Sequence, residues 1–126
     1  MKIFILEDSV ERINIFFTMF NGHNITVSNE AVTANAILDK VKFDIIFLDH
    51  DLGGQVYVDS EEENTGFQVA QHLPSTINNN TRVIIHSWNE PAACRMLYVL
   101  EHREKAFTGK VEQMMFSTFD KNILYN

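Results

Sequence analysis

The side chains best suited to chemistry stand directly after three short apolar runs of the chain. The runs are Lys2–Leu6, Asp44–Leu48 and Arg82–Ile85, and the residues that follow them are Glu7-Asp8, Asp49-His50-Asp51 and His86-Ser87-Trp88-Asn89. If the runs form neighbouring strands, several carboxylates meet at one place, where like charges raise one another's pKa or require a counter-ion. The sequence therefore indicates a site that binds a cation.

Four acidic side chains are the predicted metal ligands: Glu7, Asp8, Asp49 and Asp51. Carboxylate oxygens suit Mg²⁺, Ca²⁺ or Mn²⁺, and an added imidazole shifts the preference toward Mn²⁺, Zn²⁺ or Fe. We expect a divalent metal ion as cofactor, with Mg²⁺ or Mn²⁺ favoured and Zn²⁺ or Fe as the other candidates. Simpler interpretations stay open, because Asp8 could only cap a helix and the Asp49–Asp51 segment could only form a turn.

Two histidines at strand ends, His50 and His86, could face one substrate. Because the imidazole pKa lies near neutrality, they could form an acid–base pair, or one could bind the metal while the other transfers protons. Together with Asp49, they are the predicted catalytic residues.

Three further side chains are predicted to bind phosphate: Ser87, Asn89 and Arg12. The Ser87 hydroxyl could hold a phosphoryl oxygen beside the N-terminus of the helix that follows. Arg12, one helical turn after Asp8, could bind a phosphate through two parallel hydrogen bonds. Asn89 could instead serve only as a helix cap, Arg12 could be a solvated surface residue, and Trp88 could be a stacking face or part of the core.

These residues need a framework that brings the strand ends together. Apolar runs predict strands at 2–6, 25–27, 44–48 and 82–85, with a fifth at 106–108. Apolar residues at helical spacing predict helices over 10–20, 34–41, 65–73 and 93–100, and a final helix over 111–123, where a strand through 113–116 competes. This alternation predicts an α/β fold, a flavodoxin-like doubly wound parallel sheet with strand order 2-1-3-4-5, whose carboxyl strand ends carry the site.

Length and composition narrow the classes of function. The 126 residues fit a single domain, 1–126, and the net charge of −7 argues against duplex DNA binding, which needs clustered cations. No apolar run approaches the roughly 18 residues of a membrane span. The single cysteine, Cys94, indicates a reducing compartment, so we expect a cytoplasmic protein without membrane contact. The acidic stretch Asp59–Asn64 is interpreted as a solvated loop.

The chain resembles the receiver fold of two-component signalling. Three features carry the resemblance: the acidic pair Glu7-Asp8, the run Asp44–Asp49, and Ser87 after the fourth strand. It implies that Asp49 accepts a phosphoryl group and that Mg²⁺ binds to Asp49 and the acidic pair. Receivers also carry a lysine on strand five, for which Lys110 is the sole candidate here, and Lys110 lacks the proline that follows it in the family.

A closer resemblance is to the cyclic-phosphate processing receiver-like domains. Its motifs are Leu48-Asp49-His50-Asp51-Leu52-Gly53, Thr65-Gly66-Phe67 and His86-Ser87-x-Asn89, and the resemblance spans about residues 1–102. It implies metal-assisted processing of cyclic phosphate ends or nucleotides. Two histidines at the site agree with that chemistry, because a leaving oxygen needs a proton, whereas phosphoryl acceptance alone does not use them.

The leading hypothesis is a metal-dependent phosphodiesterase, a hydrolase that opens a cyclic phosphate or related phosphodiester. The expected partner is a small phosphate ester or nucleotide, with an RNA 2′,3′-cyclic phosphate end as one form of it. The alternatives are a phospho-accepting or degenerate receiver in signalling, or a non-catalytic module that binds a nucleotide or a protein.

Overall fold

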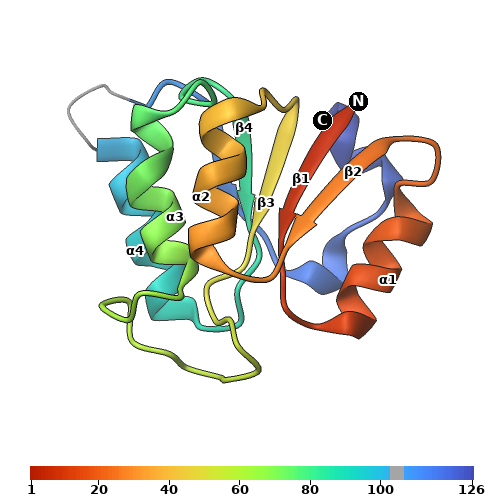
Figure 1. Cartoon of the computed structure of the whole chain (residues 1–126). Coiled ribbons are helices and arrows are strands. Elements are labelled where there is room, and N and C mark those ends of the chain that lie inside the picture. Colours follow the sequence, from red (N-terminus) through yellow and green to blue (C-terminus); the bar gives the residue numbers. More distant parts are fainter. Residues whose placement is uncertain (103–106) are drawn as a thin grey trace.

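The computed structural model of the chain describes residues 1–102 and 107–126. Its centre is a parallel sheet with the strand order β2-β1-β3-β4-β5 (Figure 1). The strands are β1 (Lys2–Leu6), β2 (Asn24–Ser28), β3 (Ile45–Leu48), β4 (Arg82–Ile85) and β5 (Val111–Gln113). The predicted fold class and strand order are therefore confirmed.

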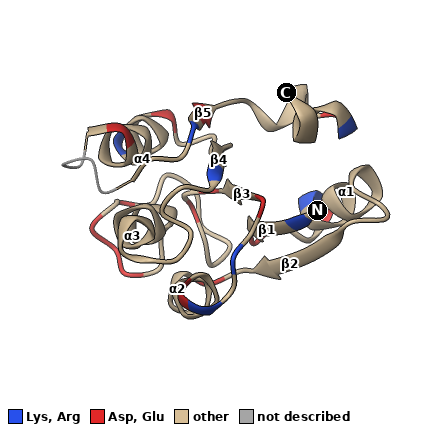
Figure 2. Ribbon diagram, turned by 90° about the horizontal axis from the view of Figure 1, so that it is seen from above, with Lys and Arg blue, Asp and Glu red and all other residues tan. Residues whose placement is uncertain are grey.

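Helices cover both faces of the sheet. The α-helices of the described residues are α1 (Val10–Met19), α2 (Ala31–Lys40), α3 (Gly66–His72) and α4 (Glu90–His102). Seen from above, α2, α3 and α4 lie on one side of the sheet, and α1 and the C-terminal segment lie on the other (Figure 2). Within the part of the chain that is described, no helix combines the length and the apolar character that a membrane crossing requires.

Alternation along the strands builds two separate cores. On β1, Phe4 and Leu6 belong to the core shared with α2, α3 and α4, whereas Ile3 and Ile5 belong to the core shared with α1. This follows from the two-residue period of a strand, which sends successive side chains to opposite faces. Because both faces are covered, the strand sequences are continuous apolar runs.

The C-terminal part differs from the prediction. The fifth strand lies at Val111–Gln113 and not at 106–108, where Phe107 and Thr108 are irregular and residue 106 lies outside the described residues. The predicted helix over 111–123 is wrong, because after β5 the chain forms only two short 3-10 helices, Phe116–Thr118 and Lys121–Tyr125. This segment still buries Phe119, Ile123 and Leu124 in the core beside α1. The apolar side chains whose spacing suggested a helix are therefore buried without forming one.

Candidate metal centre

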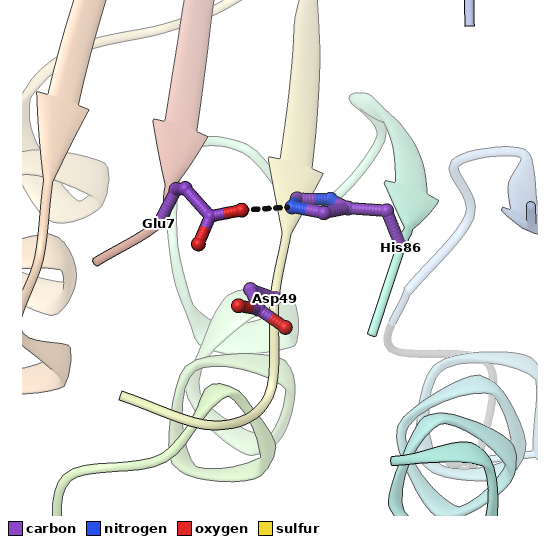
Figure 3. Close-up of side chains that lie close together, drawn as sticks. All are labelled: Glu7, Asp49 and His86. Atoms are coloured by element: carbon purple, nitrogen blue, oxygen red, sulfur yellow. Dashed lines mark hydrogen bonds and ion pairs between the residues drawn. The ribbon is translucent and has the colours of Figure 1, made fainter. Parts of the chain in front are cut away.

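Glu7, Asp49 and His86 each follow the last residue of a strand. Because the last residues of β1, β3 and β4 are register partners, the residues after them lie side by side. The ladder of hydrogen bonds continues through them: Asp49 N donates to Leu6 O and His86 N donates to Leu48 O, both at 3.0 Å. The three side chains converge (Figure 3), with one potential ligand atom from each lying within 4.8 Å of the others.

Hydrogen bonds fix the orientation of this cluster. His86 Nε2 lies 3.1 Å from Glu7 Oε1, and the tautomer with a proton on Nε2 donates to that oxygen (Figure 3). Glu7 Oε2 accepts from the backbone N–H groups of Asp8 and Ser9 at 3.0 and 3.2 Å. Glu7, Asp49 and His86 are all buried. His86 Nδ1 is also buried and has no hydrogen-bond partner among the described residues.

The two buried carboxyl groups have divergent pKa values. Burial raises the pKa of Asp49, and the charge and hydrogen bond of neighbouring Glu7 raise it further, to about 8. Burial also acts to raise the pKa of Glu7, but the hydrogen bond and charge of His86 outweigh it and lower that pKa to about 2. Near neutral pH the pair therefore holds one proton and one negative charge, until a cation replaces the proton.

Arg12 is the cationic side chain nearest the carboxylates among the described residues. Ser9 caps α1 by accepting from Arg12 N at 3.4 Å, which holds the first turn of the helix beside the end of β1. Arg12 Nη1 lies 3.4 Å from Glu7 Oε1 and 3.8 Å from Asp49 Oδ2. The side chain is 20% exposed, so the guanidinium can contact both the cluster and a ligand from solvent.

Asp8 lies at the rim of the cluster. Its Oδ2 accepts from Gly54 N at 2.6 Å. Burial and the charge of Glu7 raise its pKa, although the hydrogen bond from Gly54 opposes them. Asp8 lines a hollow of about 530 Å³ together with Glu7, Asp49 and Arg12, and we call this hollow the carboxylate pocket.

His50, Asp51 and Asn89 form a second network beside the first. His50 is fully buried, with Nδ1 2.8 Å from Asp51 Oδ1 and Nε2 3.0 Å from Ser60 Oγ. Asn89 Nδ2 donates to Asp51 Oδ1 and to Val58 O, both at 3.1 Å. Asp51 lines the carboxylate pocket, whereas His50 and Asn89 do not.

This network holds the loop between β3 and α3. Asp51 accepts from Tyr57 N at 2.6 Å and from Val58 N at 3.1 Å. Although burial acts to raise the pKa of Asp51, the hydrogen bonds from His50, Asn89 and these backbone groups lower it. The sequence did not reveal Ser60, because it lies in the acidic stretch interpreted as a solvated loop, seen in red before α3 in Figure 2. Its side chain instead packs inward against His50.

Ser87 and Asn89 lie near the cluster but outside it. Ser87 Oγ accepts from Asn89 N at 3.1 Å and lines a different hollow, shared with Trp88 and Tyr57. Asn89 Oδ1 accepts from Ala92 N at 3.3 Å, as in the alternative interpretation of Asn89 as the cap of α4.

Lys110 is far from the candidate centre along its strand. It stands directly before β5, where its carbonyl accepts from Val83 N, so it lies at the end of the sheet opposite to the cluster. Its Nζ is 3.4 Å from Glu112 Oε1 and its side chain is 63% exposed. Among the described residues, therefore, no lysine stands at this site, and Arg12 supplies the positive charge.

Gly66 lets α3 begin directly against the centre. Its N–H donates to His50 O at 2.9 Å, and a Cβ at this position would lie 1.9 Å from Asp49 O. No other residue fits this contact without moving the backbone that carries Asp49.

The donor set suits a divalent cation. Two carboxylates and one imidazole can approach one ion from three strand ends. With its proton on Nδ1, which has no hydrogen-bond partner among the described residues, His86 would offer Nε2 to the ion. The cluster is therefore a possible acidic metal site. The Arg12 guanidinium beside it is placed to contact an anion that a bound metal would attract.

Comparison with known proteins agrees with this description. Residues 3–102 match the family described as "Cyclic-phosphate processing Receiver domain". No curated protein matches the chain. The fold is shared with the receiver domain of sensor histidine kinase PA1611 from Pseudomonas aeruginosa PAO1, solved with a magnesium ion coordinated in its active-site cleft. That domain is 16% identical, with a TM-score of 0.65, and the match covers 98% of this chain and 89% of that one.

Two further solved structures show the same architecture. A CheY-like receiver domain from Methanospirillum hungatei JF-1 is 12% identical with a TM-score of 0.68, covering 98% of this chain and 86% of that one. The N-terminal domain of a response regulator/sensory box/GGDEF 3-domain protein from Carboxydothermus hydrogenoformans is 21% identical with a TM-score of 0.64. That match covers 98% of this chain and 87% of that one. At these identities the likeness shows the fold alone.

Fold and site together define a receiver-like α/β domain. Since the family match extends over most of the strands and all four described α-helices, the assignment can be narrower: the chain belongs to the cyclic-phosphate processing receiver family.

Proposed function

We propose that the chain is a metal-dependent phosphodiesterase that opens a cyclic phosphate or related phosphodiester in the carboxylate pocket. The observation that carries the proposal is the convergence of Glu7, Asp49 and His86 within 4.8 Å, with Arg12 Nη1 3.8 Å from Asp49. A cation site with an adjacent guanidinium supplies the two positive groups that a phosphodiester needs.

Glu7, Asp49 and His86 would hold the cation, which we expect to be Mg²⁺ or Mn²⁺. When bound, it would supply the positive charge that stabilises phosphoryl oxygens in the transition state and makes water a better nucleophile. Asp49 must first give up the proton that its pKa of about 8 implies. Without the cation, His86 Nε2 is bonded to Glu7 and fixes the orientation of that carboxylate.

Hydrolysis forms a bond from a water oxygen to phosphorus and breaks one P–O bond of the ring, and the leaving oxygen takes a proton. Arg12 is placed to hold the phosphoryl oxygens while this happens. Asp8 lines the pocket and has a raised pKa, so it is placed to exchange a proton with the leaving oxygen. His50 and His86 are fully buried and do not line the pocket, so in this proposal Asp8 takes the proton-transfer role.

His50, Asp51 and Asn89 then act as positioning residues. They hold the loop between β3 and α3, and that loop presents Gly54 N to Asp8. In this proposal their contribution is to fix Asp8 and the wall of the pocket and not to bind metal or phosphate directly.

The test is turnover of 2′,3′- and 3′,5′-cyclic nucleotides with Mn²⁺ or Mg²⁺, with the phosphomonoester product followed by ³¹P NMR. We expect activity that EDTA abolishes and that Asp49→Asn reduces by more than about 100-fold, since one lost electrostatic stabiliser commonly costs 10²–10³ in rate. Asp44→Asn, an exposed aspartate at the other end of β3, is the matched control. No turnover across the panel by protein that demonstrably binds metal would contradict catalysis.

Phosphoryl acceptance by Asp49 is the second candidate, favoured by its place at the end of β3 beside an acidic pair. Acetyl phosphate or beryllofluoride would then modify or bind Asp49, and Asp49→Asn would prevent it. A third outcome, nucleotide-dependent stabilisation without product, would indicate a non-catalytic binding module.

A further inference from the structure

Large apolar side chains are exposed around the candidate centre. Val56, Tyr57, Trp88 and Met115 are 79%, 73%, 72% and 67% exposed. Each lines the carboxylate pocket or the hollow next to it. Exposed apolar side chains are ordinary when scattered, but a group of them at one rim marks a binding surface.

Trp88 lines both hollows. On one side is the carboxylate pocket, and on the other is a hollow of about 630 Å³ lined also by Tyr57, Ser87, Glu90, Gln113 and Met115. We call the second hollow the aromatic pocket. A ligand that fills both pockets has to pass over the Trp88 ring.

One contact holds the ring of Trp88, and one hydrogen bond holds the backbone of Tyr57. The Arg12 guanidinium carbon lies 4.9 Å from the centroid of the Trp88 ring, a cation–π contact that links this ring to the carboxylate cluster. Tyr57 has a φ of 53°, in the left-handed region, and Asp51 holds it there by accepting from Tyr57 N at 2.6 Å. Such strained backbone persists where the surroundings enforce it, commonly at ligand-binding sites.

We propose that the aromatic pocket binds a nucleobase, which stacks on Trp88 and Tyr57 while its phosphate occupies the carboxylate pocket. The placement of the phosphate rests on the proposed function, whereas the stacking of the base does not. The substrate would then be a nucleotide or the unpaired end of a nucleic acid strand, because a paired base offers no free face to an aromatic side chain.

Charge and hydrogen-bonding groups favour a base over other occupants. Glu90 adds a negative charge to the aromatic pocket, on a chain whose net charge is already −7. Acidic peptides and anionic lipid surfaces are therefore disfavoured, whereas a neutral heterocycle is not. Glu90 and Gln113 offer acceptor oxygens to the edge of a stacked ring, which suits a base with an exocyclic amino group, adenine or cytosine.

The chain offers a direct probe, because Trp88 is its one tryptophan. We expect adenosine 2′,3′-cyclic phosphate to quench the Trp88 fluorescence of the full chain with saturation, and adenosine alone to do so at higher concentration. A base-free cyclic phosphate, glycerol 1,2-cyclic phosphate, should bind without comparable quenching.

Affinities measured by calorimetry separate stacking from other effects. Stacking of a base on an aromatic side chain commonly changes affinity by about 10- to 100-fold. We therefore expect Trp88→Ala to weaken nucleotide binding by that factor, Trp88→Phe to retain most of it, and neither variant to change the affinity for Mn²⁺. Tyr98→Ala is the control, because Tyr98 is 66% exposed but lies on α4 outside both pockets.

Equal affinity and equal turnover for the nucleotide and the base-free phosphate would overturn this inference and leave the proposed function standing. Trp88-dependent binding of neutral lipid vesicles, or Trp88-dependent self-association, without any response to nucleotides would also overturn it. Nucleotide quenching without metal binding or turnover would support the base site and contradict the proposed function instead.

Discussion

Glu7 and Asp49 place two carboxyl groups in a buried site with one shared proton and one neighbouring guanidinium. Glu7 keeps its charge because His86 and two backbone N–H groups are bonded to it, whereas Asp49 has a single backbone donor, His50 N at 2.8 Å. Burial raises both pKa values, but the charge of Glu7 raises that of Asp49 further, whereas the hydrogen bonds to Glu7 and the charge of His86 lower that of Glu7. A divalent cation would offset the repulsion between the two buried carboxylates best, since it allows both to ionise.

The raised pKa of Asp49 predicts how the stability of the metal-free protein depends on pH. Between its ordinary value of 3.8 and about 8, the native state holds a proton that the unfolded chain has lost. The stabilisation from this group is therefore present at low pH and lost as the pH rises through 8. The Asp49→Asn variant cannot titrate at this position and does not lose this stabilisation. The difference in free energy of unfolding, variant minus wild type, should therefore increase by more than about 1 kcal/mol between pH 5 and pH 9.

Urea unfolding in EDTA measures this difference, with Asp44→Asn as the matched control. If the Asp49→Asn and wild-type proteins differ by the same amount at both pH values, the proton assigned to Asp49 is not there.

Arg12 is predicted to bind substrate more than to support the fold. Arg12→Ala should raise KM for a cyclic phosphodiester by about tenfold or more, since hydrogen bonds to charged groups contribute roughly 1.5–3 kcal/mol. The affinity for Mn²⁺ should be nearly unchanged. Arg12→Lys should recover only part of the loss, because an ammonium lacks the planar pair of donors. Arg95→Ala, on the exposed side of α4, is the control, and an effect on kcat with unchanged KM would contradict the assignment.

At the scale of elements, the register of three strands determines which predicted residues meet. Glu7, Asp49 and His86 could be predicted to converge, because each directly follows an apolar run and parallel strand ends share an edge. The sequence also suggested Asp51 as a metal ligand and His50 as a catalytic residue or ligand at the same site. Successive residues at a strand end point to alternate sides, and His50 packs into a separate network. Asp51 lines the carboxylate pocket, but its carboxylate is bonded to His50 and to the backbone of the loop.

The close approach of α3 to β3 predicts that position 66 accepts only glycine. A Cβ on Gly66 would collide with the backbone of Asp49, so Gly66→Ala should destabilise the protein by about 1–3 kcal/mol or more and reduce its affinity for Mn²⁺. Gly22→Ala is strained only through its φ of 91°, with open space around it, and should leave the affinity for Mn²⁺ unchanged. Thermal unfolding and calorimetry compare each variant with the wild type, and a Gly66→Ala protein as stable as the wild type would contradict the packing described here.

The network around Asp51 predicts that the loop between β3 and α3 loosens when Asn89 loses its amide donors. Asn89→Asp keeps the acceptor that caps α4 but removes the bonds from Nδ2 to Asp51 and Val58 and places a second carboxylate near Asp51. Cleavage by a glutamate-specific protease at 61–63 should become at least several-fold faster with little change in melting temperature. Asn79→Asp, in an exposed turn, provides the comparison. Unchanged cleavage would show that the network does not restrain the loop.

At the scale of the whole molecule, strand order was predictable and the C-terminal segment was not. Continuous apolar runs separated by helical periodicity leave few ways to cover both faces of a small parallel sheet. After β5, however, burial depends on Phe119, Ile123 and Leu124 filling the space beside α1. Short 3-10 turns do this as well as a helix, and the spacing of apolar residues alone does not distinguish them.

The molecule as a whole joins a common fold to a site that departs from ordinary receivers. Its cation beside Asp49 is Arg12 on α1 rather than Lys110, and an imidazole from the end of β4 joins the carboxylates. The same edge of the sheet also carries the exposed ring of Trp88. These differences all lie at the carboxyl ends of the strands, and none alters the sheet itself.

The most direct test of a metal site at Glu7, Asp49 and His86 is anomalous scattering from a crystal of the protein soaked in MnCl₂. We predict one strong manganese peak per chain, coordinated by Glu7, Asp49 and His86, and no peak there in Asp49→Asn crystals. A wild-type crystal in which manganese binds elsewhere, or in which Glu7 and His86 remain bonded to each other with no ion between the strand ends, would contradict it.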